Sequence, residues 1–141
     1  FLDHKARIPI WSGMIQKEVA ERIASKPGKK AYGILSVLLQ AYYDIEYLFT
    51  VDEHVFNPPP KVKSAVIRMT RNNRQGLGCV EALFKNIVKT AFNQRRKQMR
   101  NSLMGLVGKE NPILNDPIFT KRPEQLSVEE FISLTKKIES L

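Results

Sequence analysis

The sequence is poor in the residues that build disulfides and metal sites. It has one cysteine, Cys79, and two histidines, His4 and His54, in 141 residues. A single cysteine excludes an internal disulfide framework and indicates a reducing compartment, which we expect to be the cytoplasm. Both histidines have polar neighbours, so no metal site is expected. No apolar run approaches the roughly 18 residues of a membrane span and no signal peptide is visible, so no membrane partner is expected either.

Acidic residues are also scarce, and their deficit is local. The chain has 23 lysine and arginine residues against 14 aspartate and glutamate residues, a formal net charge of +9. No acidic residue lies between Glu81 and Glu110, an interval that contains Lys85, Lys89, Arg95, Arg96, Lys97, Arg100 and Lys109. Such a local positive field favours a polyanionic partner, with an acidic membrane surface or simple solubility as the alternatives.

Familiar nucleotide-binding motifs are missing as well. Neither G-x-G-x-x-G nor a P-loop pattern occurs in the chain. Gly105 and Gly108 have the G-x-x-G spacing of the RNA-clamping loop of KH domains, but the strand and helix order of that domain is not predicted around them. We interpret this stretch as a helix that ends in glycine.

Hydrophobic periodicity predicts a mixed α/β first half. The predicted elements are a buried strand over residues 8–15, a helix over 17–24, a loop over 26–30, a helix over 34–42, and strands over 44–51 and 64–70. The last two strands alternate apolar and polar residues, which indicates one buried face each. Because only a short segment separates them, they are predicted to pair as an antiparallel hairpin.

The second half is predicted to be helical. A polar stretch over residues 71–76 marks the boundary, and residues 80–92 carry apolar side chains at unbroken helical spacing. Met99, Leu103 and Val107 continue such a stripe, on a kinked extension or on a second helix. Ser127 and Glu130 form the capping box of a final helix.

A proline-rich segment separates the two hairpin strands. Its sequence is FNPPPKVKSA over residues 56–65. Pro58, Pro59 and Pro60 hold φ at about −65° and remove three backbone donors, which indicates a polyproline II element. This stiff support would hold Phe56 against a flat ligand such as a base, or pack it in the core as part of a rigid connector.

The basic run over residues 93–102 has two interpretations. Its arginine and lysine side chains can neutralise phosphates, and its asparagine, glutamine and serine side chains can add hydrogen bonds to phosphate and sugar. At helical spacing Arg96 and Arg100 would share a face one turn apart. The alternative is a solvated helix face, although the run has no acidic neighbours.

Several stretches of the chain resemble the KsgA-type ribosomal RNA adenine dimethyltransferases, in that family's order and over nearly the whole length. They are QKEVAERI at 16–23, YG at 32–33 with SV at 36–37, FNPPPKVKSA at 56–65, and FNQRRK at 92–97 with RNSL at 100–103. The proline-rich run and the FNQRRK run are long and specific.

This resemblance implies an α/β fold, namely the C-terminal part of a Rossmann-like methyltransferase sheet followed by a small all-helical domain. Residues 1–72 would complete the methyltransferase domain, and residues 73–141 would form the helical rRNA-binding domain. The family's glycine-rich cofactor loop, acidic ribose-binding residue and Asn-aliphatic-Pro-aromatic motif are absent from the chain. The S-adenosylmethionine site is therefore expected upstream of Phe1, and this fragment alone is expected to be inactive.

The resemblance also implies a function and its residues. The complete enzyme would dimethylate the N6 amines of two adjacent adenines near the 3′ end of small-subunit rRNA, with the small ribosomal subunit as partner. Phe56 would pack against the extruded target adenine. The supporting residues would be Pro58, Pro59 and Pro60. The rRNA phosphates would be bound by Arg95, Arg96, Lys97 and Arg100, with Lys61 and Lys63 extending the basic surface.

Other functions remain open at this point. The chain could act alone as a non-catalytic RNA-binding or ribosome-assembly module. It could also belong to the related erythromycin-resistance methyltransferases, which modify large-subunit rRNA. A helix-turn-helix DNA-binding protein would explain the charge, but it would leave the strand–proline–strand unit without a role.

Overall fold

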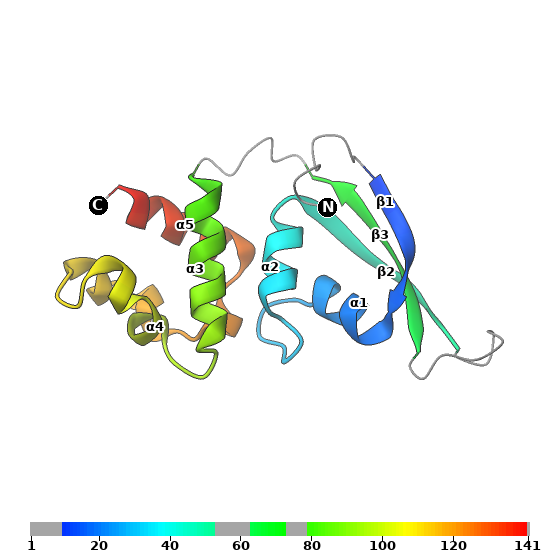
Figure 1. The fold of residues 1–141 in the computed structure, drawn as a ribbon, viewed down its shortest axis with the longest axis horizontal. Coiled ribbons are helices and arrows are strands. Elements are labelled where there is room, and N and C mark those ends of the chain that lie inside the picture. The colour runs from blue at the N-terminus through cyan, green and yellow to red at the C-terminus, as the bar shows by residue number, and fades with distance from the viewer. Residues whose placement is uncertain (1–9, 53–62, 73–78, 141) are drawn as a thin grey trace.

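The structure, a computed structural model, describes residues 10–52, 63–72 and 79–140 (Figure 1). In these ranges a three-stranded sheet with two α-helices is followed by three further α-helices. The two groups lie side by side along the long axis of the molecule, and α2 of the first group faces α3 of the second (Figure 1). The fold is therefore α/β, as predicted, with its strands in the first half of the chain.

The sheet is antiparallel and has the order β1-β3-β2. Its strands are β1, Ile10–Gln16, β2, Tyr43–Val51, and β3, Ser64–Arg71. In the central strand Ile67 pairs with Gly13 of β1 on one side and with Tyr47 of β2 on the other. The predicted hairpin of the second and third strands is confirmed.

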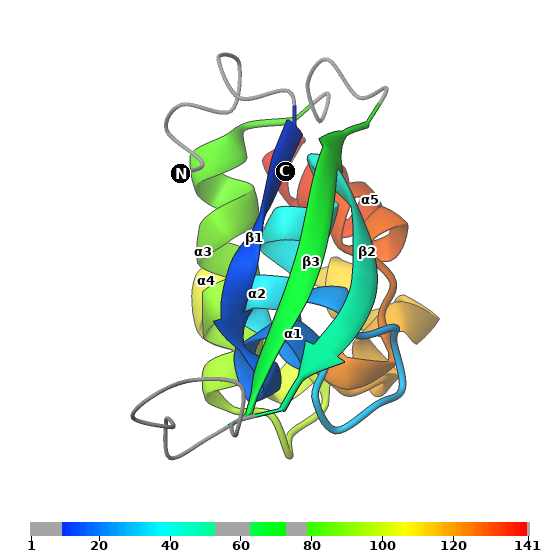
Figure 2. The ribbon, with the colours of Figure 1, turned by 90° about the vertical axis from the view of Figure 1, so that its right-hand side faces the viewer.

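Two helices cover one face of this sheet. They are α1, Lys17–Ala24, and α2, Ile34–Gln40, and both lie behind the sheet in Figure 2. Every second residue of β3 is buried, namely Ala65, Ile67 and Met69. Ile67 and Met69 border the same apolar hollow as Ile23 of α1. The alternation predicted for β3 is therefore confirmed, and it places the core between the sheet and the helices.

The burial predicted for the other two strands is wrong in part. Ile10 is 60% exposed and Met14 is 49% exposed, because β1 is an edge strand and no described residue covers the sheet face opposite the helices (Figure 2). On β2 the pairing register shifts between Tyr47 and Phe49. Such an irregularity disrupts strict alternation, and Phe49 is 55% exposed instead of buried.

The second half is helical, as predicted. Its α-helices are α3, Glu81–Asn93, α4, Met99–Val107, and α5, Val128–Glu139. The side chains of Phe84, Ile87, Val88 and Ala91 form the buried stripe of α3. Met99 and Leu103 belong to α4, so the sequence continues in a second helix and not in a kinked extension. Gly108 follows α4 with φ +99°, which confirms that this stretch ends a helix.

Proline and capping residues order the segment between α4 and α5. It contains three short 3-10 helices, η3, Pro112–Asn115, η4, Pro117–Thr120, and η5, Pro123–Gln125. The Asp116 carboxylate accepts a hydrogen bond from the backbone N–H of Ile118, and this bond, together with Lys137, lowers the pKa of Asp116. Ser127 and Glu130 exchange bonds of 3.1 Å, so the predicted capping box is confirmed.

Candidate nucleic-acid interface

The basic run forms a tight turn between α3 and α4. α3 ends because Gln94 has φ −124° and ψ 52°, outside the helical region. The backbone N–H of Lys97 then donates to the carbonyl oxygen of Gln94 at 2.9 Å. Arg96 thus lies in the turn, whereas Arg100 lies in the first turn of α4. The prediction that these two arginines share a helical face is wrong, because α3 ends at Asn93 and α4 begins only at Met99. The polar run has no apolar periodicity from which these helix ends could be predicted.

Three cations of this segment face solvent. Arg96, Lys97 and Arg100 are exposed, and the ion pairs formed within the described ranges include none of them. Two carboxylates that follow α4 in the chain already have partners: Glu124 of η5 lies 3.3 Å from Arg122, and Glu130 of α5 lies 3.3 Å from Lys121. The backbone of Lys121 itself contacts the start of α4. The turn therefore presents uncompensated positive charge.

Arg95 has a different environment from its neighbours. It is half-buried, and its Nη2 donates to the backbone carbonyl oxygens of Lys29 at 3.2 Å and Lys30 at 2.7 Å. Its guanidinium carbon lies 5.8 Å from the centre of the Phe92 ring. These contacts join the α3–α4 turn to the loop between α1 and α2. The predicted phosphate contact of Arg95 stays a prediction, and part of its donor capacity is used inside the protein.

The other predicted site residues lie between β2 and β3 in the sequence. Phe56, Pro58, Pro59, Pro60 and Lys61 lie outside the described residues, so their roles stay predictions. Lys63, directly before β3, is exposed, and its carbonyl oxygen accepts from the backbone N–H of Lys17 at 2.9 Å. Figure 2 shows the ends of β2 and β3 that flank this loop at the same end of the molecule as the α3–α4 turn. The structure thus brings Lys63 and the basic turn to one end of the fold.

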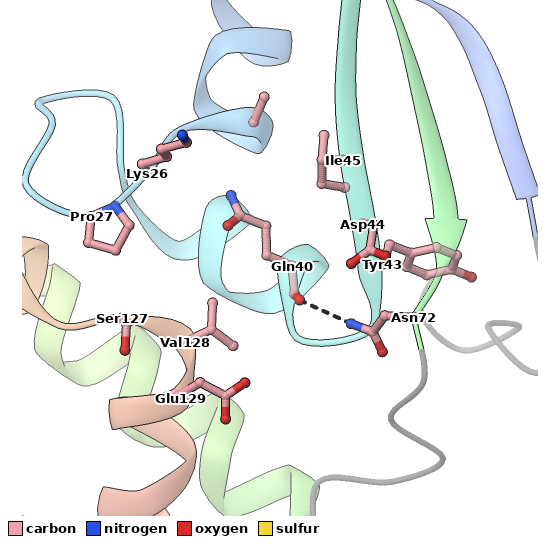
Figure 3. Close-up of a pocket in the computed structure, with 11 residues that line it drawn as sticks. Lys26, Pro27, Gln40, Tyr43, Asp44, Ile45, Asn72, Ser127, Val128 and Glu129 are labelled. Carbon is pink, nitrogen blue, oxygen red and sulfur yellow. Dashed lines mark hydrogen bonds between the residues drawn. The ribbon is translucent and has the colours of Figure 1, made fainter.

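A hollow of about 770 Å³ lies between the sheet and the start of α5 (Figure 3). Its charged lining residues, Lys26, Asp44 and Glu129, carry both signs. The side-chain amide of Asn72 donates to the carbonyl oxygen of Gln40 at 3.4 Å, a bond drawn in Figure 3. The lining residues carry charges of both signs, and two of them are hydrogen-bonded to each other. These features fit a junction between the two halves of the fold better than a binding site for a polyanion.

Two kinds of feature are not found in the described part of the chain. No group of three histidine, cysteine, aspartate or glutamate side chains is placed to hold a metal ion there. Among those same residues, no helix is both long enough and apolar enough to cross a bilayer.

The chain matches the family described as ribosomal RNA adenine dimethylase over residues 10–139. It belongs to this family. The match takes in the sheet, the basic turn and all five α-helices. The family resemblance that the sequence motifs indicate is thereby confirmed.

Relatives of this dimethylase-family chain include whole proteins and solved structures. The ribosomal RNA small subunit methyltransferase A of Phocaeicola vulgatus is 70% identical over 139 residues, which make up 99% of this chain and 50% of that protein. A dimethyladenosine transferase from Plasmodium falciparum has a TM-score of 0.81 at 19% identity, over 94% of this chain and 59% of that one. The 23S rRNA methyltransferase ErmE has a TM-score of 0.58 at 20% identity, over 92% and 55%. At these identities the two structures show likeness of fold alone.

The sequence patterns of this dimethylase-family member did not predict one contact of the candidate interface. The loop over residues 26–30 reads KPGKK and was predicted only as a loop. Its backbone carbonyl oxygens hold Arg95, which lies 65 residues after Lys30 in the chain. The charge of the loop was visible in the sequence, but its contact with the turn depends on how α2 packs on α3.

Proposed function

We propose that this chain is the C-terminal half of an S-adenosylmethionine-dependent rRNA (adenine-N6)-dimethyltransferase. The enzyme would act on two adjacent adenines near the 3′ end of small-subunit rRNA, in the cytoplasm and during ribosome biogenesis. The observation that carries the proposal is the α3–α4 turn of a dimethylase-family chain, where Arg96, Lys97 and Arg100 are exposed and have no ion pair among the described residues. Contacts between such cationic side chains and backbone phosphates position a protein on a nucleic acid without reading its sequence.

The proposal includes the division of the chain into two domains. Residues 1–72 would complete a Rossmann-like methyltransferase sheet, and residues 73–141 would form the rRNA-binding domain. The position of β1 at an edge supports the first assignment, because further strands can pair with its backbone there. The exposed side chains of Ile10 and Met14 also support it, because they leave apolar surface on a sheet face for further elements to cover. The length of the relatives supports it too, since the chain spans about half of the curated relatives that it matches.

S-adenosylmethionine would supply the methyl group, but the described residues do not fit a site for it. A cofactor loop of the Rossmann type needs glycines where a strand turns into a helix. Among the described glycines only Gly28 and Gly108 have positive φ, and each follows a helix instead of a strand. The cofactor site is therefore proposed to lie in sequence upstream of Phe1.

This chain would contribute positioning and base packing to the reaction. Arg95, Arg96, Lys97 and Arg100 would bind backbone phosphates of the rRNA, with Lys61 and Lys63 extending the surface toward the hairpin loop. Phe56, supported by Pro58, Pro59 and Pro60, would form an aromatic wall against the extruded adenine.

Arg96→Ala is expected to weaken the binding of a labelled hairpin RNA from the 3′ end of small-subunit rRNA. Loss of one phosphate contact reduces the slope of log K against log salt by about 0.9, which corresponds to about fivefold in affinity at 0.15 M salt. Binding isotherms at several KCl concentrations measure both quantities. Lys136→Ala removes the same charge from the far end of α5 and should leave both unchanged. Unchanged affinity and slope for Arg96→Ala would contradict the phosphate contact.

The activity itself is tested by methyl transfer from labelled S-adenosylmethionine to unmethylated small ribosomal subunits. This chain is assayed beside a complete protein in which it is joined to the upstream half of a relative. We expect activity in the complete protein alone. Activity in neither would refute the methyltransferase assignment or its substrate, and turnover by this chain alone would refute an upstream cofactor site.

A further inference from the structure

We propose that a second phosphate site for the rRNA backbone lies in the hollow between the start of α2 and the end of α3, which we call the Lys30 hollow. The inference rests on the proposed function, because it takes RNA as the ligand. The hollow has a volume of about 320 Å³ and is lined by the basic residues Arg22, Lys30 and Arg95 over an apolar floor of Ile34, Leu35 and Phe92. Figure 1 shows the two helices that border it, α2 and α3, side by side.

The charge around this hollow is of one sign. Its lining residues include three cations and no carboxylate. Arg22 is bonded to Glu18 at 2.8 Å, but both side chains are largely exposed, so solvent weakens this pair. Lys30 is exposed, and the ion pairs within the described ranges do not include it. The lining therefore carries net positive charge with at least one ammonium group available to a ligand.

The guanidinium group of Arg95 is already oriented toward this hollow. Its Nη2 donates to the carbonyl oxygens of Lys29 and Lys30, and its guanidinium carbon lies over the Phe92 ring, 5.8 Å from the ring centre. Its Nη1 points to Gly33, where an added Cβ atom would stand 3.8 Å away. No hydrogen bond from this Nη1 is formed to a described residue. An arginine held in this way loses little conformational entropy when it binds a phosphate.

An RNA backbone fits this arrangement better than a free anion. Arg95 borders the hollow, and the next two residues, Arg96 and Lys97, are the exposed cations of the turn. A strand bound at the turn therefore passes the hollow and can place a further phosphate there. Lys29 and Lys30 then join the interface from the first half of the chain, so that RNA would contact both halves at once.

The test compares Lys30→Ala with Lys136→Ala in the full chain. Each change removes one exposed lysine charge, and Lys136 lies in the last turn of α5, where Glu139 accepts a hydrogen bond from the backbone N–H of Val80 just before α3. Affinity for the labelled 3′-end hairpin RNA is measured over a range of KCl concentrations, and again in potassium phosphate of equal ionic strength. For Lys30→Ala we expect about fivefold weaker binding at 0.15 M salt and a slope reduced by about 0.9. For Lys136→Ala we expect no change.

The outcomes separate this inference from the proposed function. If Lys30→Ala binds like Lys136→Ala while Arg96→Ala is weakened, the Lys30 site is refuted and the proposed function stands. If the unaltered chain does not bind the hairpin, RNA binding by this chain fails and the Lys30 site fails with it. If Lys30→Ala weakens RNA binding in chloride and the difference disappears in phosphate buffer, free phosphate competes with the RNA backbone for the same hollow, which supports the RNA site. A weakening of similar size in both salts supports the RNA site.

Discussion

Phe131→Ala is expected to lower the free energy of unfolding of this chain by about 3–5 kcal/mol, the usual range for a buried phenylalanine. Phe131 is fully buried, and its ring lies 5.8 Å from that of Phe92. Phe92 in turn meets the buried ring of Tyr32 edge-on at 6.0 Å. This row of three rings joins α5 and α3 to the segment before α2, so its loss should loosen the contact between the two halves.

Urea unfolding followed by circular dichroism measures this effect, and Phe49→Ala is its matched control. Phe49 is 55% exposed on the open face of the sheet, so the same substitution there should change the free energy of unfolding by less than about 1 kcal/mol. Equal losses for the two variants would contradict the role given to the aromatic row. A loss confined to Phe131→Ala would confirm it.

Elements whose structure depends on their own side chains could be predicted from the sequence. α3 is an example, because Phe84, Ile87 and Val88 recur at helical spacing and are all buried. The capping box of α5 is another, since Ser127 and Glu130 need only each other's backbone. β3 was predicted correctly because it is the central strand, where neighbours on both sides keep the alternation regular.

Features that depend on distant segments could not be predicted. β1 is mostly apolar, but apolarity does not reveal that one sheet face is left uncovered by the described residues. Arg96 and Arg100 were expected to share a helical face, whereas Gln94 leaves the helical region before them and the backbone N–H of Met99 donates to the carbonyl oxygen of Lys121 at 2.7 Å. The role of Arg95 is set by two carbonyl oxygens more than sixty residues away, which no local pattern encodes.

The same limit applies to the candidate site. The sequence motifs identify Arg96, Lys97 and Arg100 as cations, and the structure adds that they are exposed. Only the packing of α2 against α3 brings Lys30 near this turn. The candidate interface is therefore visible in the sequence only as separate basic segments, which the fold brings together at Lys30 and Arg95.

Phe56→Ala in the complete enzyme is expected to reduce methyl transfer by about 10-fold to 100-fold. Stacking of a base on an aromatic ring contributes about 1–3 kcal/mol, and each 1.4 kcal/mol corresponds to about tenfold in rate. The affinity for rRNA should be largely kept, because it comes mainly from phosphate contacts that this change leaves in place. Single-turnover methylation of unmethylated small subunits, beside equilibrium binding of the hairpin RNA, measures the two effects separately.

The matched control is Phe56→Trp, which keeps a flat ring at the same position and should retain most of the turnover. Phe56 follows β2, whose last residue is Val51, so a core role would also show in the stability of the hairpin. Urea unfolding of the same variants decides between the two roles. If Phe56→Ala loses stability as Phe131→Ala does, Phe56 packs in the core as part of a rigid connector. If stability is kept while turnover falls, the ring acts on the target base.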